Sequence, residues 1–146
     1  MERKLCRAAG IIIYRKKHGE NKILGLEALS YLKSRSHGIY DVPKGMIDEG
    51  EDPEDCARRE CYEETSLRPA NFTAGPHKSG MLWLWLAECD ETPVLKINPA
   101  TGQKEHLGYE WLDIDDIIEN CLDYLRPSLM WAKKVLENDD KTFTRK

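Results

Sequence analysis

The chain has few of the features that mark disulfide-rich, membrane-spanning or strongly charged proteins. Its five cysteines are an odd number and contain no C-x-x-C pair, which argues against a disulfide framework and a thiolate zinc site. No apolar run approaches the roughly 20 residues of a membrane helix. The formal net charge is only −4, so a nucleic-acid coat is not indicated. We expect a cytoplasmic protein with free thiols and no membrane association.

The N-terminal region also lacks the pattern of a secretory signal. Its one short apolar run, Ala8 to Tyr14, leads directly into Arg15-Lys16-Lys17 without a small-residue cleavage site. The chain shows neither an internal repeat nor a linker. Its 146 residues, 40% hydrophobic and 33% charged, suit one globular domain with its own core. We therefore expect a single monomeric domain over residues 1–146, with a tail that frays after about residue 138.

The order of predicted elements is strands, helix, strands, helix. The longest apolar strand is predicted over Met81–Cys89, with Trp83 and Trp85 on one face, as core or groove lining. Such an order favours a mixed sheet between helices, an α/β (α+β) arrangement. The further strands are predicted at Cys6–Tyr14, Ile23–Tyr31, Tyr40–Val42, Phe72–Ala74 and Tyr109–Leu112, with an edge pairing at Val94–Ile97; further helices are predicted at Asp116–Leu122 and from Pro127 onward.

One short helix concentrates the acidic residues. Asp52 suits the N-cap and Pro53 the first helical position, and the helix is predicted to end near Thr65. On it, carboxylates at positions 60, 63 and 64 share one face, where like charges destabilise a helix. A divalent cation is the simplest group to offset that repulsion, and Mg²⁺ prefers such oxygens. A plain solvated helix face is the alternative for the glutamates alone.

The spacing around this helix is more specific than the glutamates. Gly45 is followed by five residues and Glu51, and seven more precede the run from Arg59 to Leu67. This closely resembles the signature of the Nudix hydrolases, a glycine and a glutamate followed by R-E-U-x-E-E-x-G-U, where U is bulky and aliphatic. Cys61 takes the first U position, and Ser66 replaces the late glycine. A serine adopts the left-handed conformation at a helix end less easily than glycine.

The resemblance implies a Nudix-type α/β/α sandwich and a metal-dependent hydrolysis of nucleoside diphosphates linked to another group. It assigns divalent metal binding, by Mg²⁺ or Mn²⁺, to Glu60, Glu63 and Glu64. Arg59 and Glu51 take supporting roles in catalysis, and their side chains are expected to pair and lock the loop onto the helix.

The segments flanking the signature resemble those of asymmetric dinucleoside tetraphosphate hydrolases. Tyr40 and the sequence Pro43-Lys44-Gly45 are similar to their W-x-P-P-K-G segment, and the run from Glu105 to Leu112 is similar to their E-H-x-x-Y-x-W-L segment. The resemblance implies cleavage of diadenosine tetraphosphate to ATP and AMP. RNA 5′-pyrophosphohydrolases and diphosphoinositol polyphosphate phosphohydrolases share similar segments, so an RNA 5′ end or a diphosphoinositol is the alternative substrate. A Nudix-fold binding module without turnover is disfavoured because all the carboxylates of the signature are present.

These flanking segments supply the remaining site candidates. Glu105 resembles a further metal ligand or base from outside the signature, although an ordinary loop acid is the alternative. Six residues are assigned to substrate binding. Their expected roles are to contact phosphate, to stack a ring on a base, or to provide a glycine in the loop: Tyr40, Lys44, Gly45, Lys78, His106 and Tyr109. The alternatives are an exposed surface position for Lys44 and Lys78 and a core position for Tyr109.

Overall fold

The computed structural model describes residues 6–29 and 38–144. Its strands are β1 (Ala8–Lys17), β2 (Glu20–Ala28), β3 (Tyr40–Asp41), β4 (Lys44–Met46), β5 (Phe72–Ser79), β6 (Leu82–Glu88), β7 (Ile97–Asn98), β8 (Gln103–Lys104) and β9 (His106–Asp113). Its helices are α2 (Pro53–Thr65), α3 (Ile114–Asn120) and α4 (Arg126–Thr144), with a 3-10 turn η2 (Asp123–Leu125). None of the helices in this part of the chain combines the length and apolarity needed to span a bilayer.

Seven of the described strands form one mixed sheet with the order β3-β2-β1-β6-β5. β1 is parallel to β6 and antiparallel to β2, and β9 runs antiparallel along β2. β4 pairs with the start of β1, where Ala9 lies opposite Gly45. β7 and β8 form a separate two-stranded hairpin. β4 precedes α2 in the chain and is paired with β1. The sheet therefore holds Gly45, the first residue of the signature, close to the helix.

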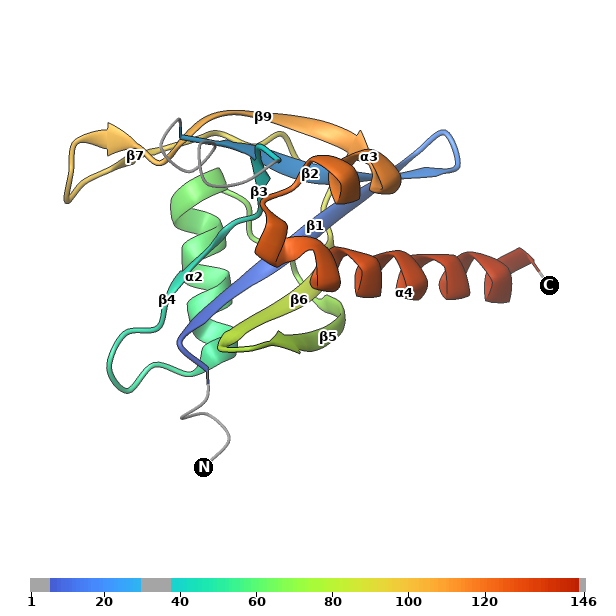
Figure 1. Ribbon diagram of the computed structural model, residues 1–146, viewed down its shortest axis with the longest axis horizontal. Helices are drawn as coiled ribbons and strands as arrows, with labels where there is room; N and C mark the ends of the chain where they lie inside the picture. The colour runs from blue at the N-terminus through green and yellow to red at the C-terminus, as the bar shows by residue number, and fades with distance from the viewer. Residues whose placement is uncertain (1–5, 30–37, 145–146) are drawn as a thin grey trace.

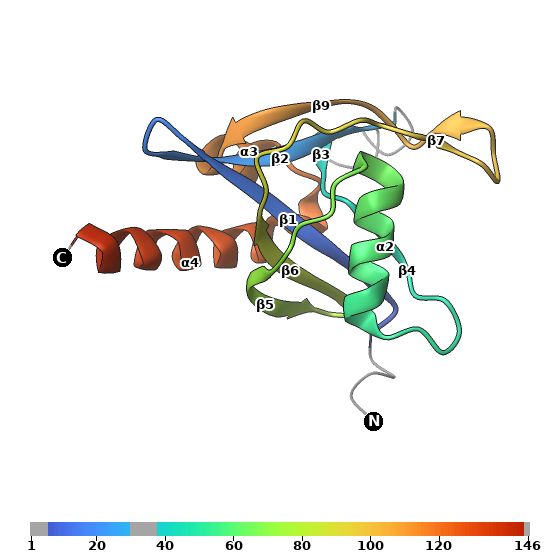
Figure 2. The ribbon, with the colours of Figure 1, turned by 180° about the vertical axis from the view of Figure 1, so that it is seen from behind.

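Helices cover both faces of this sheet, so the predicted α/β/α sandwich is confirmed. In Figure 1, α4 crosses in front of the central strands, and Figure 2, seen from the opposite side, shows α2 in front of β1. Two separate clusters of buried side chains match these layers, one including residues of α3 and α4 and the other residues of α2.

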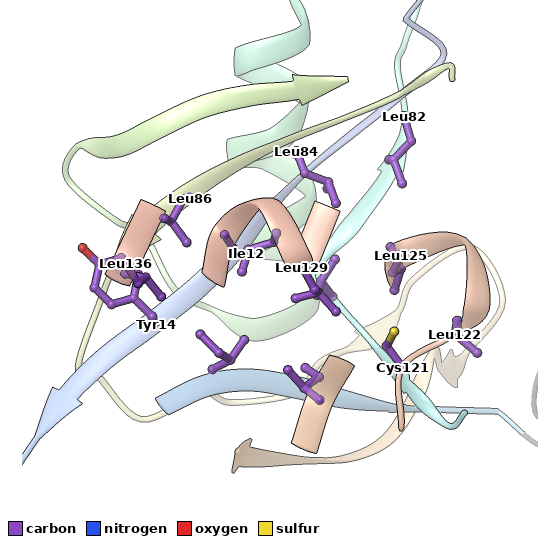
Figure 3. Close-up of a cluster of buried hydrophobic side chains, with 14 of the residues drawn as sticks. Ile12, Tyr14, Leu82, Leu84, Leu86, Cys121, Leu122, Leu125, Leu129 and Leu136 are labelled. Carbon is purple, nitrogen blue, oxygen red and sulfur yellow. The ribbon is translucent and has the colours of Figure 1, made fainter. Parts of the chain in front are cut away.

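Side chains along the two central strands, β1 and β6, alternate strictly between the two clusters. Ile12 and Leu84 belong to the cluster beneath α4, where Leu129 of that helix also packs (Figure 3). Ile11 of β1 and Trp85 of β6 belong to the cluster beneath α2. Successive strand residues point to opposite faces, so strands covered on both sides need apolar residues throughout. This confirms β6 as a strand apolar on both faces and Trp83 and Trp85 as core.

Several elements extend beyond their predicted bounds, the strands among them because pairing overrides weak local signals. β5 continues to Ser79 against β6, although it is polar and holds Pro76, which sits on an edge strand next to a register irregularity. β9 begins at His106 rather than Tyr109 because it pairs with β2 from Lys22 to Ala28. Helix α4 continues past residue 138, where the sequence suggests fraying, to Thr144.

Other bounds shift along the chain. β2 covers Glu20–Ala28, earlier than the predicted Ile23–Tyr31, whose last residues lie outside the described part of the chain. Helix α3 begins at Ile114, two residues before the predicted start. The predicted edge pairing near Val94–Ile97 is displaced to β7, which pairs with β8 and not with the main sheet. This hairpin projects beside the C-terminal end of α2, where it forms one wall of a cavity.

Candidate active site

Helix α2 turns its small residues to the sheet. Asp52 caps the helix as predicted, accepting a hydrogen bond from Glu54 N at 3.1 Å. Cys56, Ala57 and Cys61 are fully buried in the cluster beneath the helix. All five cysteines are free and buried, as expected. Because these small residues occupy the stripe facing the sheet, the three glutamates project from the adjoining face.

Arg59 joins the loop before α2 to the acidic face. Its Nε and Nη2 donate to the two oxygens of Glu51 at 2.8 and 3.0 Å, so the expected pairing is present. Nη1 donates to Glu60 at 2.9 Å and to Glu63 at 3.0 Å, and Nη2 donates to the Met46 carbonyl at 3.0 Å. The hydrogen bonds to Glu51 are the main cause that raises the pKa of Arg59 and lowers that of Glu51. One guanidinium thus fixes three carboxylates and the end of β4.

Gly45 lies directly against a carboxylate of the acidic helix. A Cβ at this position would lie 2.1 Å from Cδ of Glu60 and 2.2 and 2.4 Å from its two oxygens. Close approach of the strand to the carboxyl group therefore explains this glycine, and Gly45 acts on the site through Glu60. Gly50, at φ +76°, supplies the turn between β4 and α2.

Glu60 and Glu64 form a carboxyl pair on successive turns of α2. They share a hydrogen bond, and burial raises the pKa of both groups, most strongly for Glu64. The hydrogen bond to Glu60 and the nearby Asp41 raise the pKa of Glu64 further. A buried carboxylate this close to a partly buried one favours a shared proton or a bound cation.

Four residues form a closed network that includes Glu64 of this pair, and we call it the Asp41 network: Asp41, Lys44, Glu64 and His106. Lys44 Nζ and His106 Nε2 each lie 3.2 Å from the Asp41 carboxylate. The Lys44 backbone N–H donates to Glu64 Oε2 at 3.3 Å, and His106 Nδ1 lies 3.7 Å from Glu64 Oε1. The exposed fractions of Asp41, Glu64 and His106 are only 4%, 7% and 7%.

Charge pairing outweighs burial inside the Asp41 network. Burial alone opposes the charged form of Asp41, but the His106 hydrogen bond and the Lys44 charge leave its pKa below the ordinary value. Burial likewise opposes the charged form of Lys44, but the Asp41 charge leaves its pKa above the ordinary value. Asp41 and Lys44 are therefore a buried ion pair at neutral pH.

Two cavities meet at Glu64. One of about 520 Å³ lies between α2 and the β7–β8 hairpin, with Glu60 and Glu63 on one wall and Lys96 on the other. The second, of about 410 Å³, is lined by Asp41, Lys44 and Lys104. Four residues line both cavities: Glu64, Asn98, Glu105 and His106. Glu64 thus borders both cavities, and each cavity also has a lysine in its lining.

The predicted site residues outside α2 fall into two groups. Glu105 lines both cavities and accepts a hydrogen bond from Asn98 Nδ2 at 2.6 Å. Lys44 and His106 also lie at the site. Three others are absent from the described residues that line these cavities: Tyr40, Lys78 and Tyr109.

Each of these three has a different place. Tyr40 packs against the core beneath α4, and its hydroxyl donates to Glu110. Lys78 lies over the Trp83 ring, with Nζ 4.1 Å from the ring centroid. Tyr109 is 40% exposed on β9.

The sequence did not single out Asp41 as a site residue. A lone aspartate in the segment Tyr40–Val42 carries no periodic or spacing signal that marks it as functional. Lys96 and Asn98 were also missed, because Lys96 directly precedes β7 and Asn98 belongs to it, and the position of both depends on the β7–β8 pairing.

The donor set of the site suits a hard divalent cation. Glu64 is a buried carboxylate beside the partly buried Glu60, and oxygen donors of this kind match Mg²⁺ and Mn²⁺. In residues 6–29 and 38–144, no group of three or more potential ligand side chains is arranged around a common point. Glu60 and Glu63 both accept from Arg59, and Glu105 accepts from Asn98. Because Glu60 and Glu64 already share a hydrogen bond, they would hold the cation first, and Glu63 and Glu105 would join by exchanging their partners.

Ser66 adopts the left-handed conformation that its place in the signature requires. It ends α2 with φ 67° and ψ 7°, and its N–H donates to the Tyr62 carbonyl at 2.9 Å. Its hydroxyl donates to the Val94 carbonyl at 2.9 Å, a bond that glycine cannot make. This bond offsets part of the cost of the conformation and ties the helix end to the segment leading into β7.

The fold and the acidic helix beside a cavity define an enzyme of the Nudix hydrolase class. A family model described as the NUDIX domain matches residues 4–136, and the chain belongs to this family. The asymmetrical bis(5′-nucleosyl)-tetraphosphatase of Rattus norvegicus is 31% identical over 124 residues, covering 75% of this chain and 80% of that protein.

Two further similar proteins act on different kinds of substrate. An RNA pyrophosphohydrolase of Rhodospirillum rubrum is 33% identical over 107 residues, covering 60% of this chain. The chain spans 65% of that protein, just under two thirds of its length. A crystal structure of a C. elegans Ap4A hydrolase binary complex superposes with a TM-score of 0.67 at 25% identity, covering 92% of this chain and 99% of that one. The family and these relatives together indicate an enzyme that hydrolyses pyrophosphate bonds.

Proposed function

We propose that this protein hydrolyses a phosphoanhydride bond of a dinucleoside polyphosphate, cleaving diadenosine tetraphosphate asymmetrically to ATP and AMP. The observation that carries the proposal is the position of Glu64 at the junction of two cavities, each of which also offers a lysine. A substrate with a nucleotide on both sides of the cleaved bond can place one arm in each cavity. The likeness to tetraphosphatases over most of the chain supports the same substrate class.

The side chains of the site divide the work of such a reaction. A bound Mg²⁺ or Mn²⁺ ion would polarise a phosphoryl oxygen and lower the pKa of a coordinated water. Glu60 and Glu64 would hold that ion, while Arg59 keeps Glu60 and Glu63 in place. Lys44, fixed by Asp41, would neutralise a phosphate oxygen in the second cavity. A carboxylate of the acidic helix that does not bind the ion would accept the proton of the attacking water.

An RNA with a 5′-triphosphate is the second candidate substrate. Its support is the similarity to RNA pyrophosphohydrolases, which extends over 60% of the chain for the Rhodospirillum rubrum protein. In this case the terminal phosphates would occupy one cavity and the first nucleotides the other. In either case we propose that the protein acts as a monomer in the cytoplasm, where its five buried thiols stay reduced.

A product assay separates these substrates. The purified protein is incubated with Mg²⁺ and either diadenosine tetraphosphate or a triphosphate-ended RNA, and the products are resolved by chromatography. We expect ATP and AMP in equal amounts from the first substrate, and loss of the reaction when the metal is removed with a chelator. Faster release of pyrophosphate or phosphate from the RNA would favour the second candidate instead.

A charge-removing substitution tests the site itself. Glu64→Gln keeps the shape of the side chain but removes the negative charge, so turnover should fall to background while the melting temperature stays close to that of the wild type. Glu54→Gln, on the exposed first turn of the same helix, is the matched control and should retain full activity. A folded Glu64→Gln protein with substantial activity would refute the assignment.

A further inference from the structure

Asp41 and His106 are almost completely buried beside Glu64, although the proposed reaction assigns them no direct contact with a phosphate. Burying charged or polar groups costs free energy, and apolar side chains of similar volume often serve stability as well or better. Stability alone therefore does not account for an aspartate and a histidine at this place. Their partners within the site give a better account.

The Glu64 carboxylate is held from two sides. One oxygen accepts from the Lys44 backbone N–H at 3.3 Å, and the other lies 3.7 Å from Nδ1 of His106. The opposite ring nitrogen, Nε2, lies 3.2 Å from Asp41. The imidazole therefore presents one nitrogen to each carboxylate, and its orientation is set by Asp41.

Asp41 is in turn fixed by groups that cannot move far. It accepts from the Val42 backbone N–H at 2.8 Å and pairs with Lys44 Nζ at 3.2 Å. The Asp41 network is closed, because Lys44 contacts both Asp41 and Glu64. Fixing a free glutamate side chain costs rotamer entropy, and the network meets this cost during folding.

We propose that Asp41 and His106 are positioning residues that hold the Glu64 carboxylate at the junction of the two cavities, ready to bind a divalent cation. His106 acts by contact with Glu64, and Asp41 acts through His106. The inference rests on the metal-binding role proposed for Glu64. It also replaces the expectation that His106 stacks on a base, since only 7% of this residue is exposed.

The main test removes the imidazole. His106→Leu keeps a buried apolar side chain at this position, while Asp41 retains its bonds to Lys44 and Val42. We expect Mn²⁺ affinity, measured by calorimetry without nucleotide, to fall about 10- to 100-fold, as is usual for partners of metal ligands. The kcat should fall by a similar factor while KM for the dinucleotide changes little. His106→Gln, which can bridge the two carboxylates again, should recover part of both losses.

His77 provides a matched control on the other side of the sheet. Its Nδ1 lies 3.0 Å from Ser128 Oγ and its ring stacks on Trp131 of α4. His77→Leu also removes a partly buried, hydrogen-bonded histidine, but it should leave Mn²⁺ affinity and kcat unchanged. If both histidine variants lose affinity equally, the effect is one of general stability and the proposal is overturned.

Further outcomes are equally decisive. A folded His106→Leu protein with wild-type Mn²⁺ affinity and kcat overturns the proposal. Should that variant not fold, Asp41→Asn preserves the shape of the network but weakens the hold on His106, and unchanged Mn²⁺ affinity there overturns it as well. Weaker Mn²⁺ binding by these variants supports the positioning role even if the wild type hydrolyses none of the nucleotides tested, in which case only the proposed substrate fails. Absence of Mn²⁺ binding by the wild type overturns both.

Discussion

Replacement of Gly45 by alanine should inactivate the enzyme while leaving its fold nearly intact. The added Cβ would lie 2.2 Å from one Glu60 oxygen, whereas ordinary contacts begin at 3.4 Å. The carboxyl group must therefore retreat by roughly 1 Å. It is the end of a flexible side chain, so it can rotate away without moving β4 or α2.

The size of the two effects follows from this geometry. Loss of the 2.9 Å hydrogen bond between Arg59 and Glu60 costs about 1 kcal/mol, because the pair is partly exposed to solvent. In a domain of this size that lowers the melting temperature by about 2–4 °C. A catalytic group displaced by about 1 Å costs on the order of 100-fold in rate. Gly45→Ala should therefore lose kcat far more than stability.

Gly10→Ala is the contrasting control. Its Cβ would lie 2.3 Å from the Pro43 carbonyl oxygen and 2.5 Å from Lys44 Cβ, at the backbone where β1 and β4 meet. Neither group can swing aside, so this variant should lose about 1–3 kcal/mol of stability or more. Thermal melting, Mn²⁺ calorimetry and steady-state kinetics on both variants make the comparison. A Gly45→Ala protein with wild-type kcat and Mn²⁺ affinity, or one that melts as early as Gly10→Ala, would refute the reasoning.

Three further substitutions test other parts of the structure. Arg59→Lys keeps the charge but loses the fork that binds Glu51, so kcat/KM should fall about 10-fold or more with a small change in melting temperature; equal kinetics would contradict the role given to Arg59. Leu129→Ala opens a cavity beneath α4 and should cost about 2–5 kcal/mol in urea unfolding, with the kcat of the folded protein unchanged. Burial lowers the pKa of His77 from 6.5, so its contribution to stability is present above pH 6.5 and is lost as pH falls through the lower folded pKa. The free energy of unfolding of His77→Gln, measured from pH 5 to 8, should lack this decline relative to the wild type; parallel curves would show that His77 does not cause it.

The acidic helix is the part of the site that local sequence predicts best. Its cap at Asp52, its end near Thr65 and the shared face of Glu60, Glu63 and Glu64 all follow from helical periodicity within a few residues. The pairing of Glu51 with Arg59 is also found, across a loop short enough for spacing to imply contact. Periodicity likewise predicts the alternating core strands.

Only some of the residues assigned from the flanking segments lie at the site, because sequence spacing does not predict which way a side chain points. Lys44 and Glu105 line the cavities, while Tyr40 turns into the core and its hydroxyl reaches Glu110. Lys78 lies on an edge strand over Trp83. Each of these orientations depends on strand register, which is set by pairing partners far away in sequence.

By itself, the sequence determined the two-faced strands, the capped acidic helix and the cluster of carboxylates that calls for a cation, because each depends on side chains within one or two turns or along one strand. Only the tertiary structure decided that Asp41 meets His106. β3 pairs with one edge of β2 and β9 with the other, near the end of that strand, with Leu26 opposite Asp41 and Ala28 opposite His106. Residues 65 positions apart thus share one buried contact because a third strand aligns them, and no local pattern records that alignment.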